Sequence, residues 1–167
     1  MNGTIPPEIG HLSQLQNLII KNNKGLSGYL PNTLGHSTKL TQLGLYNNSL
    51  SGTIPEWLTR ATSLTYINLS RNSLVGSIPL SIENLKSLQI LDLMNNKLEG
   101  DLPLDQLSKT GITYLGLSNN GFSGMLDSSI GLISTLEYLY MDGNQFRGKI
   151  PTDIGTLTNL SESLSKT

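Results

Sequence analysis

The sequence predicts an α/β repeat, a solenoid of stacked coils with a parallel β-sheet, because the same two blocks of residues recur along the chain. A block of the form G-x-I-P or G-x-L-P returns every 24 or 25 residues, and a leucine-rich block that ends in asparagine follows six of its copies. The 167 residues include 46 Leu and Ile, 16 Asn and 17 Gly, but a single Val. Ordinary parallel sheets are rich in valine, so this composition favours a repeated leucine template.

The first block sets the period through its glycine and proline. Its glycines are Gly3, Gly28, Gly52, Gly76, Gly100, Gly124 and Gly148. Six of the seven prolines follow three residues later, at Pro6, Pro31, Pro55, Pro79, Pro103 and Pro151, and Asp127 takes the remaining place. Glycine suits a backbone conformation that a side chain would prevent, and proline fixes an extended segment and then ends it. The first unit is one residue longer, at Lys24-Gly25, which explains its spacing of 25.

The second block predicts one short strand per coil. It has the form L-x-x-L-x-L-x-x-N and occupies residues 15–23, 40–48, 64–72, 88–96, 112–120 and 136–144. Its last two leucine positions are two apart, so both side chains lie on one face of a strand while the residue between them points away. A lone strand cannot bury these leucines, but stacked strands about 4.8 Å apart can.

Two further columns predict how each coil closes. The block ends on a ladder of asparagines whose amides can satisfy backbone groups at the turn, at Asn23, Asn48, Asn72, Asn96, Asn120 and Asn144. A second apolar column follows three residues after the proline position, in a short helical or 3₁₀ turn, at Ile9, Leu34, Leu58, Ile82, Ile130 and Ile154. Gln106 interrupts this column, and we expect Leu107 to replace it.

The unit at residues 50–73 resembles the plant-type leucine-rich repeat, with its G-x-I-P element; it reads L-S-G-T-I-P-E-W-L-T-R-A-T-S-L-T-Y-I-N-L-S-R-N-S. The resemblance covers about residues 2–160. It implies a right-handed solenoid with the parallel sheet on its concave face, helical or 3₁₀ turns on its convex face, and a second short strand near L-x-G-x-I-P. It also implies a receptor or receptor-like ectodomain that binds a protein or peptide.

The chain departs from that family at its ends. We expect a single domain over residues 1–167, with six to seven repeats and without the cysteine-paired caps of relatives, because the sequence has no cysteine. It opens within a repeat, and we find no signal peptide and no transmembrane run, so it is either a fragment or an uncapped relative. The resemblance implies an extracellular or cell-surface location, and the missing caps and signal leave the cytoplasm as the alternative.

The variable positions of the strand block form the candidate site. Five of the six tyrosines fall there, and tyrosine offers a large rigid surface with a polar tip. We predict a shallow ligand site on the concave face that comprises Tyr46, Tyr66, Asn68, Arg71, Ile90, Asp92, Met94, Tyr114, Tyr138, Tyr140 and Asp142. A structural interpretation stays open, in which these tyrosines only fill strands and pack across them.

Other functions are weighed against this binding role. The column before the ladder could present an ice-binding lattice, at Asn22, Asn47, Arg71, Asn95, Asn119 and Gly143. An uncapped N-terminal coil could support self-association. The sequence predicts no enzyme, no cofactor and no metal site, since it contains no cysteine, two histidines and no phosphate-binding loop. The net charge of −1 predicts no nucleic-acid partner, and no membrane insertion is expected.

Overall fold

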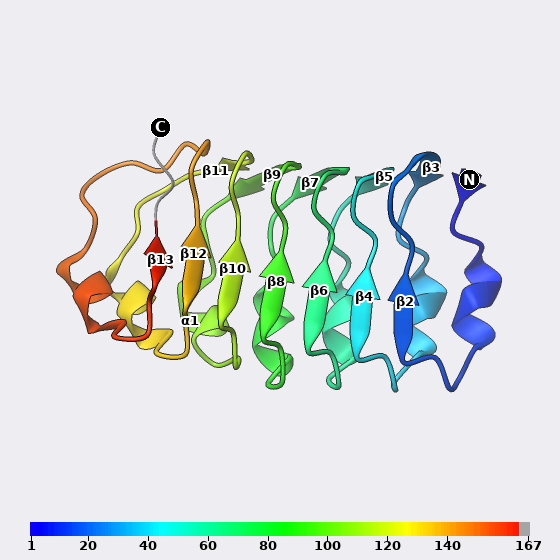
Figure 1. Ribbon diagram of the computed structural model, residues 1–167, viewed down its shortest axis with the longest axis horizontal. Coiled ribbons are helices and arrows are strands. Elements are labelled where there is room, and N and C mark those ends of the chain that lie inside the picture. The colour runs from blue at the N-terminus through cyan, green and yellow to red at the C-terminus, as the bar shows by residue number, and fades with distance from the viewer. Residues whose placement is uncertain (164–167) are drawn as a thin grey trace.

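The computed structural model describes residues 1–163 and confirms the solenoid: successive coils add parallel strands to two sheets (Figure 1). The larger sheet has the strand order β13-β12-β10-β8-β6-β4-β2. Its strands are β2 (Asn17–Ile19), β4 (Gln42–Gly44), β6 (Tyr66–Asn68), β8 (Ile90–Asp92), β10 (Tyr114–Gly116), β12 (Tyr138–Tyr140) and β13 (Glu162–Ser163). These strands come from the leucine-rich block, as predicted. We call the solvent-facing side of this sheet the concave face.

A second parallel sheet forms around the G-x-I-P block, as the resemblance implied. Its strands are β1 (Asn2–Thr4), β3 (Asn23–Gly28), β5 (Asn48–Gly52), β7 (Ser73–Gly76), β9 (Lys97–Gly100) and β11 (Gly121–Phe122). The pairing of β3 with β5 shifts register between Asn23 and Ser27, where the first unit has its additional residue. A Cβ atom at Gly25 would lie 1.8 Å from Asn2 Oδ1 and 2.9 Å from the carbonyl of Met1, so a side chain there would displace β1 or the Asn2 side chain. We call the exposed side of this sheet the lateral face.

Short turns complete each coil on the side opposite the concave face (Figure 1). The 3₁₀ turns are η1 (Pro7–His11), η2 (Asn32–His36), η3 (Glu56–Arg60), η4 (Leu80–Asn84), η5 (Ser128–Leu132) and η6 (Thr152–Thr156). The corresponding turn after Pro103 is instead the α-helix α1 (Leu104–Leu107). The backbone N–H of Ser108 donates to the carbonyl of Leu104 at 2.9 Å, and the altered turn buries Leu107 completely. Leu107 therefore fills the place that Gln106 leaves, as predicted.

The core consists of the leucine columns and one large aromatic ring. Leu43 of β4 and Leu45, two residues further on, are both fully buried, and so is Phe122, the last residue of β11. The residue between two strand leucines points to the concave face, so Asn68 is half-buried between the buried Ile67 and Leu69. The period-two alternation therefore separates core positions from candidate binding positions along every strand.

The turn asparagines connect neighbouring coils by hydrogen bonds to the backbone. Asn72 donates through Nδ2 to the carbonyls of Leu45 and Leu69, at 2.8 and 3.0 Å, and its Oδ1 accepts from the N–H of Leu50 at 3.0 Å. Asn96, in the next coil, repeats this set one period further on. The amides thus pair backbone groups that the turn of the strand would otherwise leave without partners.

Candidate functional site

The strand register brings the predicted binding columns together on the concave face. Tyr66, Ile90, Tyr114 and Tyr138 are paired in register across β6, β8, β10 and β12. A second row of Asn68, Asp92, Gly116 and Tyr140 lies two residues further along the same strands. Neighbouring strands lie about 4.8 Å apart, so side chains of one row contact each other directly.

Three tyrosine rings form the largest cluster on this face. The ring of Tyr114 lies with its centroid 5.5 Å from that of Tyr140 and 6.1 Å from that of Tyr138, and both pairs are tilted. Tyr138 is 36% exposed, whereas Tyr114 and Tyr140 are half-buried. Tilted rings at this separation attract each other, and they fix one another with little loss of side-chain freedom on binding. The tyrosine cluster is therefore a rigid and partly apolar surface open to solvent.

Asp92 lies beside the tyrosine cluster and is held by its neighbours. Its Oδ2 accepts from Asn68 Nδ2 at 3.0 Å, and its Oδ1 accepts from the backbone N–H of Met94 at 3.1 Å. Burial raises the pKa of the Asp92 carboxyl above its usual range, and hydrogen bonds from Met94, Ser70 and Asn68 and the charge of Arg71 oppose this shift. The structure therefore holds one oriented carboxylate in a partly desolvated place on the concave face.

The phenol of Tyr114 lies in the same partly desolvated environment as Asp92. Burial, and then the negative charge of Asp92, raise the pKa of Tyr114 to about 12. The hydroxyl of Tyr114 therefore remains protonated, and can donate a hydrogen bond, at every pH at which a protein of this kind works. Ser70, in the coil of β6 next to that of Asp92, donates its hydroxyl proton to Asn68 Oδ1 at 2.6 Å.

The remaining predicted site residues lie on the same face but outside the tyrosine cluster. The ammonium of Lys21 lies 5.6 Å from the ring centroid of Tyr46, toward the N-terminal coils. Asp142 accepts a hydrogen bond from the hydroxyl of Ser118 near the C-terminal coils. Met94 lies in the column between them, one place after Leu93. The concave face therefore carries a basic N-terminal part and an acidic, aromatic C-terminal part.

Arg71 is the exception in a column of left-handed turn residues. Asn22, Asn47, Asn95 and Asn119 have φ between 56° and 62°, and Arg71 has φ 55°. Asparagine and glycine adopt this conformation readily, because a short polar side chain or none relieves the steric conflict. The asparagines of this column are thus explained by the backbone conformation, which does not favour arginine at the same position.

We expect the substitution Arg71→Asn to raise the free energy of unfolding by about 1 kcal/mol, because a left-handed conformation costs about that much for a residue with a long side chain. Chemical denaturation of both proteins measures the difference. The substitution Asn95→Arg is the matched control, and it should lower stability by a similar amount. A loss of stability in Arg71→Asn would show that the guanidinium makes a stabilising contact that outweighs the strain.

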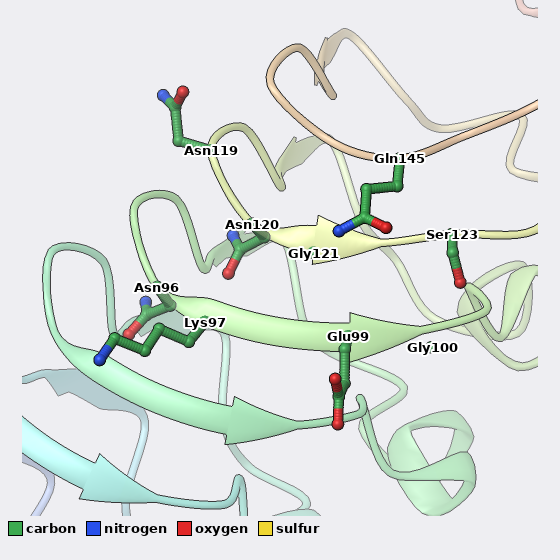
Figure 2. A pocket seen from close by; sticks show the side chains of 9 residues that line it. All are labelled: Asn96, Lys97, Glu99, Gly100, Asn119, Asn120, Gly121, Ser123 and Gln145. Carbon is green, nitrogen blue, oxygen red and sulfur yellow. The ribbon is translucent and has the colours of Figure 1, made fainter.

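The structure also contains a polar hollow on the lateral face that sequence reasoning missed (Figure 2). It has a volume of about 610 Å³ and lies over β9 and β11, with Lys97 and Glu99 on one side and Gln145 on the other. Gly121 lines the hollow without a side chain, whereas the corresponding residues of the neighbouring coils, Lys97 and Gln145, carry one. The lone glycine in that column was the available signal. Two of the lining residues, Asn96 and Asn120, are engaged in the asparagine ladder.

The N-terminal coil is partly covered by its own neighbours. Ile5 and Leu18 are buried, whereas Leu12 is 53% exposed beside His11 and Leu15. Strand β2 is the edge strand of the larger sheet. Self-association through this coil stays a prediction.

The described residues contain no group of three or more His, Asp or Glu side chains placed to hold a metal ion. Among the same residues 1–163, no helix combines the length and the apolar character that crossing a lipid bilayer requires.

Two family models, each described as leucine rich repeat, match the chain, one over residues 38–98 and the other over residues 135–157. No curated protein matches the chain significantly. The match at residues 38–98 includes the strands β4, β6 and β8, and the match at residues 135–157 includes β12 with Tyr138 and Tyr140 of the tyrosine cluster.

Solved structures extend the similarity to nearly the whole chain. The plant peptide hormone receptor RGFR1, solved with RGF2, is 38% identical with a TM-score of 0.91, over 95% of this chain and 25% of the receptor chain. The Arabidopsis receptor kinase HAESA, solved with the peptide hormone IDA and the co-receptor SERK1, is 31% identical with a TM-score of 0.88, over 96% of this chain and 26% of that chain. The chain thus spans about a quarter of the length of these receptors.

A shorter relative is covered more fully. The leucine-rich-repeat ectodomain of the receptor kinase SOBIR1 from Arabidopsis thaliana is 31% identical with a TM-score of 0.72, over 80% of this chain and 72% of that ectodomain. Repeat, register and asparagine ladder agree with these similarities to plant receptor kinase ectodomains. The chain belongs to the leucine-rich repeat family.

Proposed function

We propose that this chain is a non-catalytic binding module that recognises a peptide, or an extended segment of a protein, on the C-terminal half of its concave face. The observation that carries the proposal is the tyrosine cluster of Tyr114, Tyr138 and Tyr140, with ring centroids 5.5 and 6.1 Å apart on a solvent-facing sheet. Rigid aromatic groups that remain partly exposed are the side chains that most often anchor a partner.

The shape of the site supports an extended ligand. The paired rows run across β6, β8, β10 and β12, so a bound chain can contact one coil after another along the solenoid axis. The similar receptors RGFR1 and HAESA are described with the peptide hormones RGF2 and IDA. This similarity also supports an extracellular or cell-surface location as part of the proposal.

A peptide selected from a random displayed library on the immobilised protein tests the proposal. We expect Tyr114→Ala to weaken binding of the selected peptide about 30-fold, because truncating a central aromatic anchor costs about 2 kcal/mol of binding free energy. Calorimetric titration of both proteins measures the change. The matched control is Tyr29→Ala, since Tyr29 is 73% exposed and lies over Gly52 in the second sheet, away from the concave face.

Two results would contradict the proposal. One is a selected peptide that binds Tyr114→Ala as tightly as the wild type. The other is a peptide that loses affinity only for Tyr29→Ala, which would move the binding surface to the lateral face.

An ice-binding role receives less support from the structure. The asparagines of the candidate lattice adopt left-handed backbone conformations, with φ of 62° at Asn22 and 58° at Asn119. Their residue type therefore follows from the turn, without a need to present a lattice to ice. Asn47 also donates its amide to Asn22 Oδ1 at 2.7 Å, which engages both side chains. Strong inhibition of ice recrystallisation by the protein would instead favour an ice-binding role over peptide binding.

A further inference from the structure

The polar hollow on the lateral face opens over Gly121, which pairs in register with Glu99 of β9 (Figure 2). A Cβ atom built on Gly121 would lie 3.1 Å from the carbonyl oxygen of Leu98, 3.7 Å from Glu99 Cβ and 3.8 Å from Gln145 Nε2. Glu99 and Gln145 thus border the hollow from two different coils, and Gly121 and Gly100 line it with backbone atoms alone. The volume of about 610 Å³ lies within the range of small-molecule sites.

The side chains around the hollow are polar and keep their hydrogen-bonding groups for solvent. Four of them have no hydrogen-bond partner within residues 1–163, namely Lys97, Glu99, Ser123 and Gln145. The one ion pair in the described part of the chain joins Lys109 to Glu83 at the convex turns, so Lys97 and Glu99 form no ion pair with each other. An ammonium group, a carboxylate, a hydroxyl and an amide are therefore all available to a ligand at one place.

Ser123 differs in this respect from the serines at the same position of earlier coils. Ser27 donates its hydroxyl proton to the carbonyl of Gly3 at 3.4 Å, and Ser51 donates to that of Gly28 at 3.5 Å. The hydroxyl of Ser123 makes no such bond among the described residues, although its side chain is half-buried. The polar groups of the earlier coils are thus used within the solenoid, whereas those around Gly121 are not.

The lining selects against charged and apolar ligands. It carries one positive and one negative side chain, so an anion that pairs with Lys97 is repelled by Glu99, and a cation meets the reverse. An ammonium group only donates hydrogen bonds and a carboxylate only accepts them, but a hydroxyl group does both at one atom. A ligand with several hydroxyl groups therefore satisfies both side chains without a charge of its own. Among the described residues, no aliphatic or aromatic side chain lines the hollow to favour an apolar ligand.

We propose that the hollow over Gly121 is a second binding site, which takes a short uncharged oligosaccharide. Hydroxyl groups of the sugar donate to the Glu99 carboxylate and accept from Lys97 Nζ and Gln145 Nε2, while one ring lies against the Gly121 backbone. This inference goes beyond the proposed function, since the site lies on the lateral face. Each polar group exchanges a hydrogen bond to water for one to the sugar, so we expect a weak site with a dissociation constant of about 1 mM.

The test is a titration of the isotope-labelled protein, observed by NMR through the side-chain amide signal of Gln145. One probe is cellotetraose, which represents a structural polysaccharide, and the other is a released high-mannose glycan, which represents a glycoprotein. We expect at least one probe to shift the Gln145 signal, with half-saturation at about 1 mM. The same titration in about 1 M salt should give the same affinity, because neither probe is charged.

Substitutions locate the sugar. Gly121→Gln fills the hollow with the side chain that the next coil carries at this position, and it should weaken binding at least about tenfold. Ser49→Gln is the matched control, since it adds the same side chain at the same repeat position but outside the hollow, and it should keep the wild-type affinity. If Gly121→Gln fails to fold, Gln145→Ala replaces it; that variant should weaken binding about threefold to tenfold, as observed through the backbone amide signals of Gly100 and Ser123.

Three results would overturn the inference. The first is the absence of a shift with both probes at about 20 mM. The second is unchanged affinity in a folded Gly121→Gln protein. The third is tighter binding of a charged probe, for which trigalacturonate, a glucosamine tetramer and the zwitterion glycylglycine serve. The selected peptide is titrated separately, and its dependence on Tyr114 decides the proposed function whatever the sugar does.

Discussion

The substitution Phe122→Ala is expected to lower the free energy of unfolding by about 4 kcal/mol. Phe122 is fully buried and is the largest of the fully buried side chains, at a position that the preceding coils fill with Leu50, Leu74 and Leu98. Truncating a buried phenylalanine removes its transfer free energy and leaves a cavity, which together cost about 3–5 kcal/mol. The coils above and below are stacked on this ring, so they cannot move independently to fill the space. Thermal and chemical denaturation measure the loss.

Two matched substitutions accompany that prediction. Phe122→Leu restores the residue type of Leu74 and Leu98 and should cost about 1 kcal/mol, because most of the volume remains. Phe146→Ala changes the same residue type in the next coil, where the ring is only partly buried, and should cost clearly less than Phe122→Ala. Equal losses for Phe122→Ala and Phe146→Ala would contradict the burial argument.

The substitution Asn72→Ala is expected to lower the free energy of unfolding by about 3 kcal/mol. It leaves the N–H of Leu50 without its acceptor, and it removes one of the two asparagine donors from each of the carbonyls of Leu45 and Leu69. A buried N–H group without a partner costs about 1–3 kcal/mol, and each lost hydrogen bond about 1 kcal/mol. Denaturation with urea measures the difference, and the slope of the transition should remain unchanged.

The first asparagine of the ladder provides the control. Asn23 donates to the carbonyl of Lys21 at 2.7 Å and accepts from the exposed N-terminal amine, so water can replace its partners. Asn23→Ala should therefore cost less than about 1 kcal/mol. If Asn23→Ala and Asn72→Ala destabilise the protein equally, the ladder does not act through buried backbone groups.

Repetition made most of the fold predictable from the sequence. One copy of the leucine block would fit a strand or part of a helix, but six copies in register fix the strand and the face that is buried. The sequence marked one additional residue at Lys24-Gly25 through the spacing of 25, and the structure adds that the pairing of β3 with β5 shifts register there. The interruption at Gln106 predicted that Leu107 enters the core. The change from a 3₁₀ turn to the α-helix α1 was not predictable, because it depends on how Leu104 and Leu107 pack together.

The sequence predicted which face carries the candidate site, but it did not predict how the side chains of that site contact one another. The alternation within the strands assigned Tyr114, Tyr138 and Tyr140 to the concave face, and the structure adds the contact between their rings. The sequence could not show that Asp92 is partly desolvated, since that depends on neighbours one coil away on either side. The left-handed backbone conformation of Arg71 was not predicted either, because the column that contains Arg71 was considered only as a possible ice-binding lattice.

The tyrosine distribution offers one direct test of the binding face, since five of the six tyrosines lie on the concave columns and Tyr29 lies directly after β3 of the second sheet. The measurement is NMR of the protein with isotope-labelled tyrosine rings during titration with a selected peptide. The binding account predicts that the ring signals of Tyr114, Tyr138 and Tyr140 shift in proportion to occupancy while that of Tyr29 remains in place. A shift of Tyr29 with the three cluster signals unchanged would contradict it.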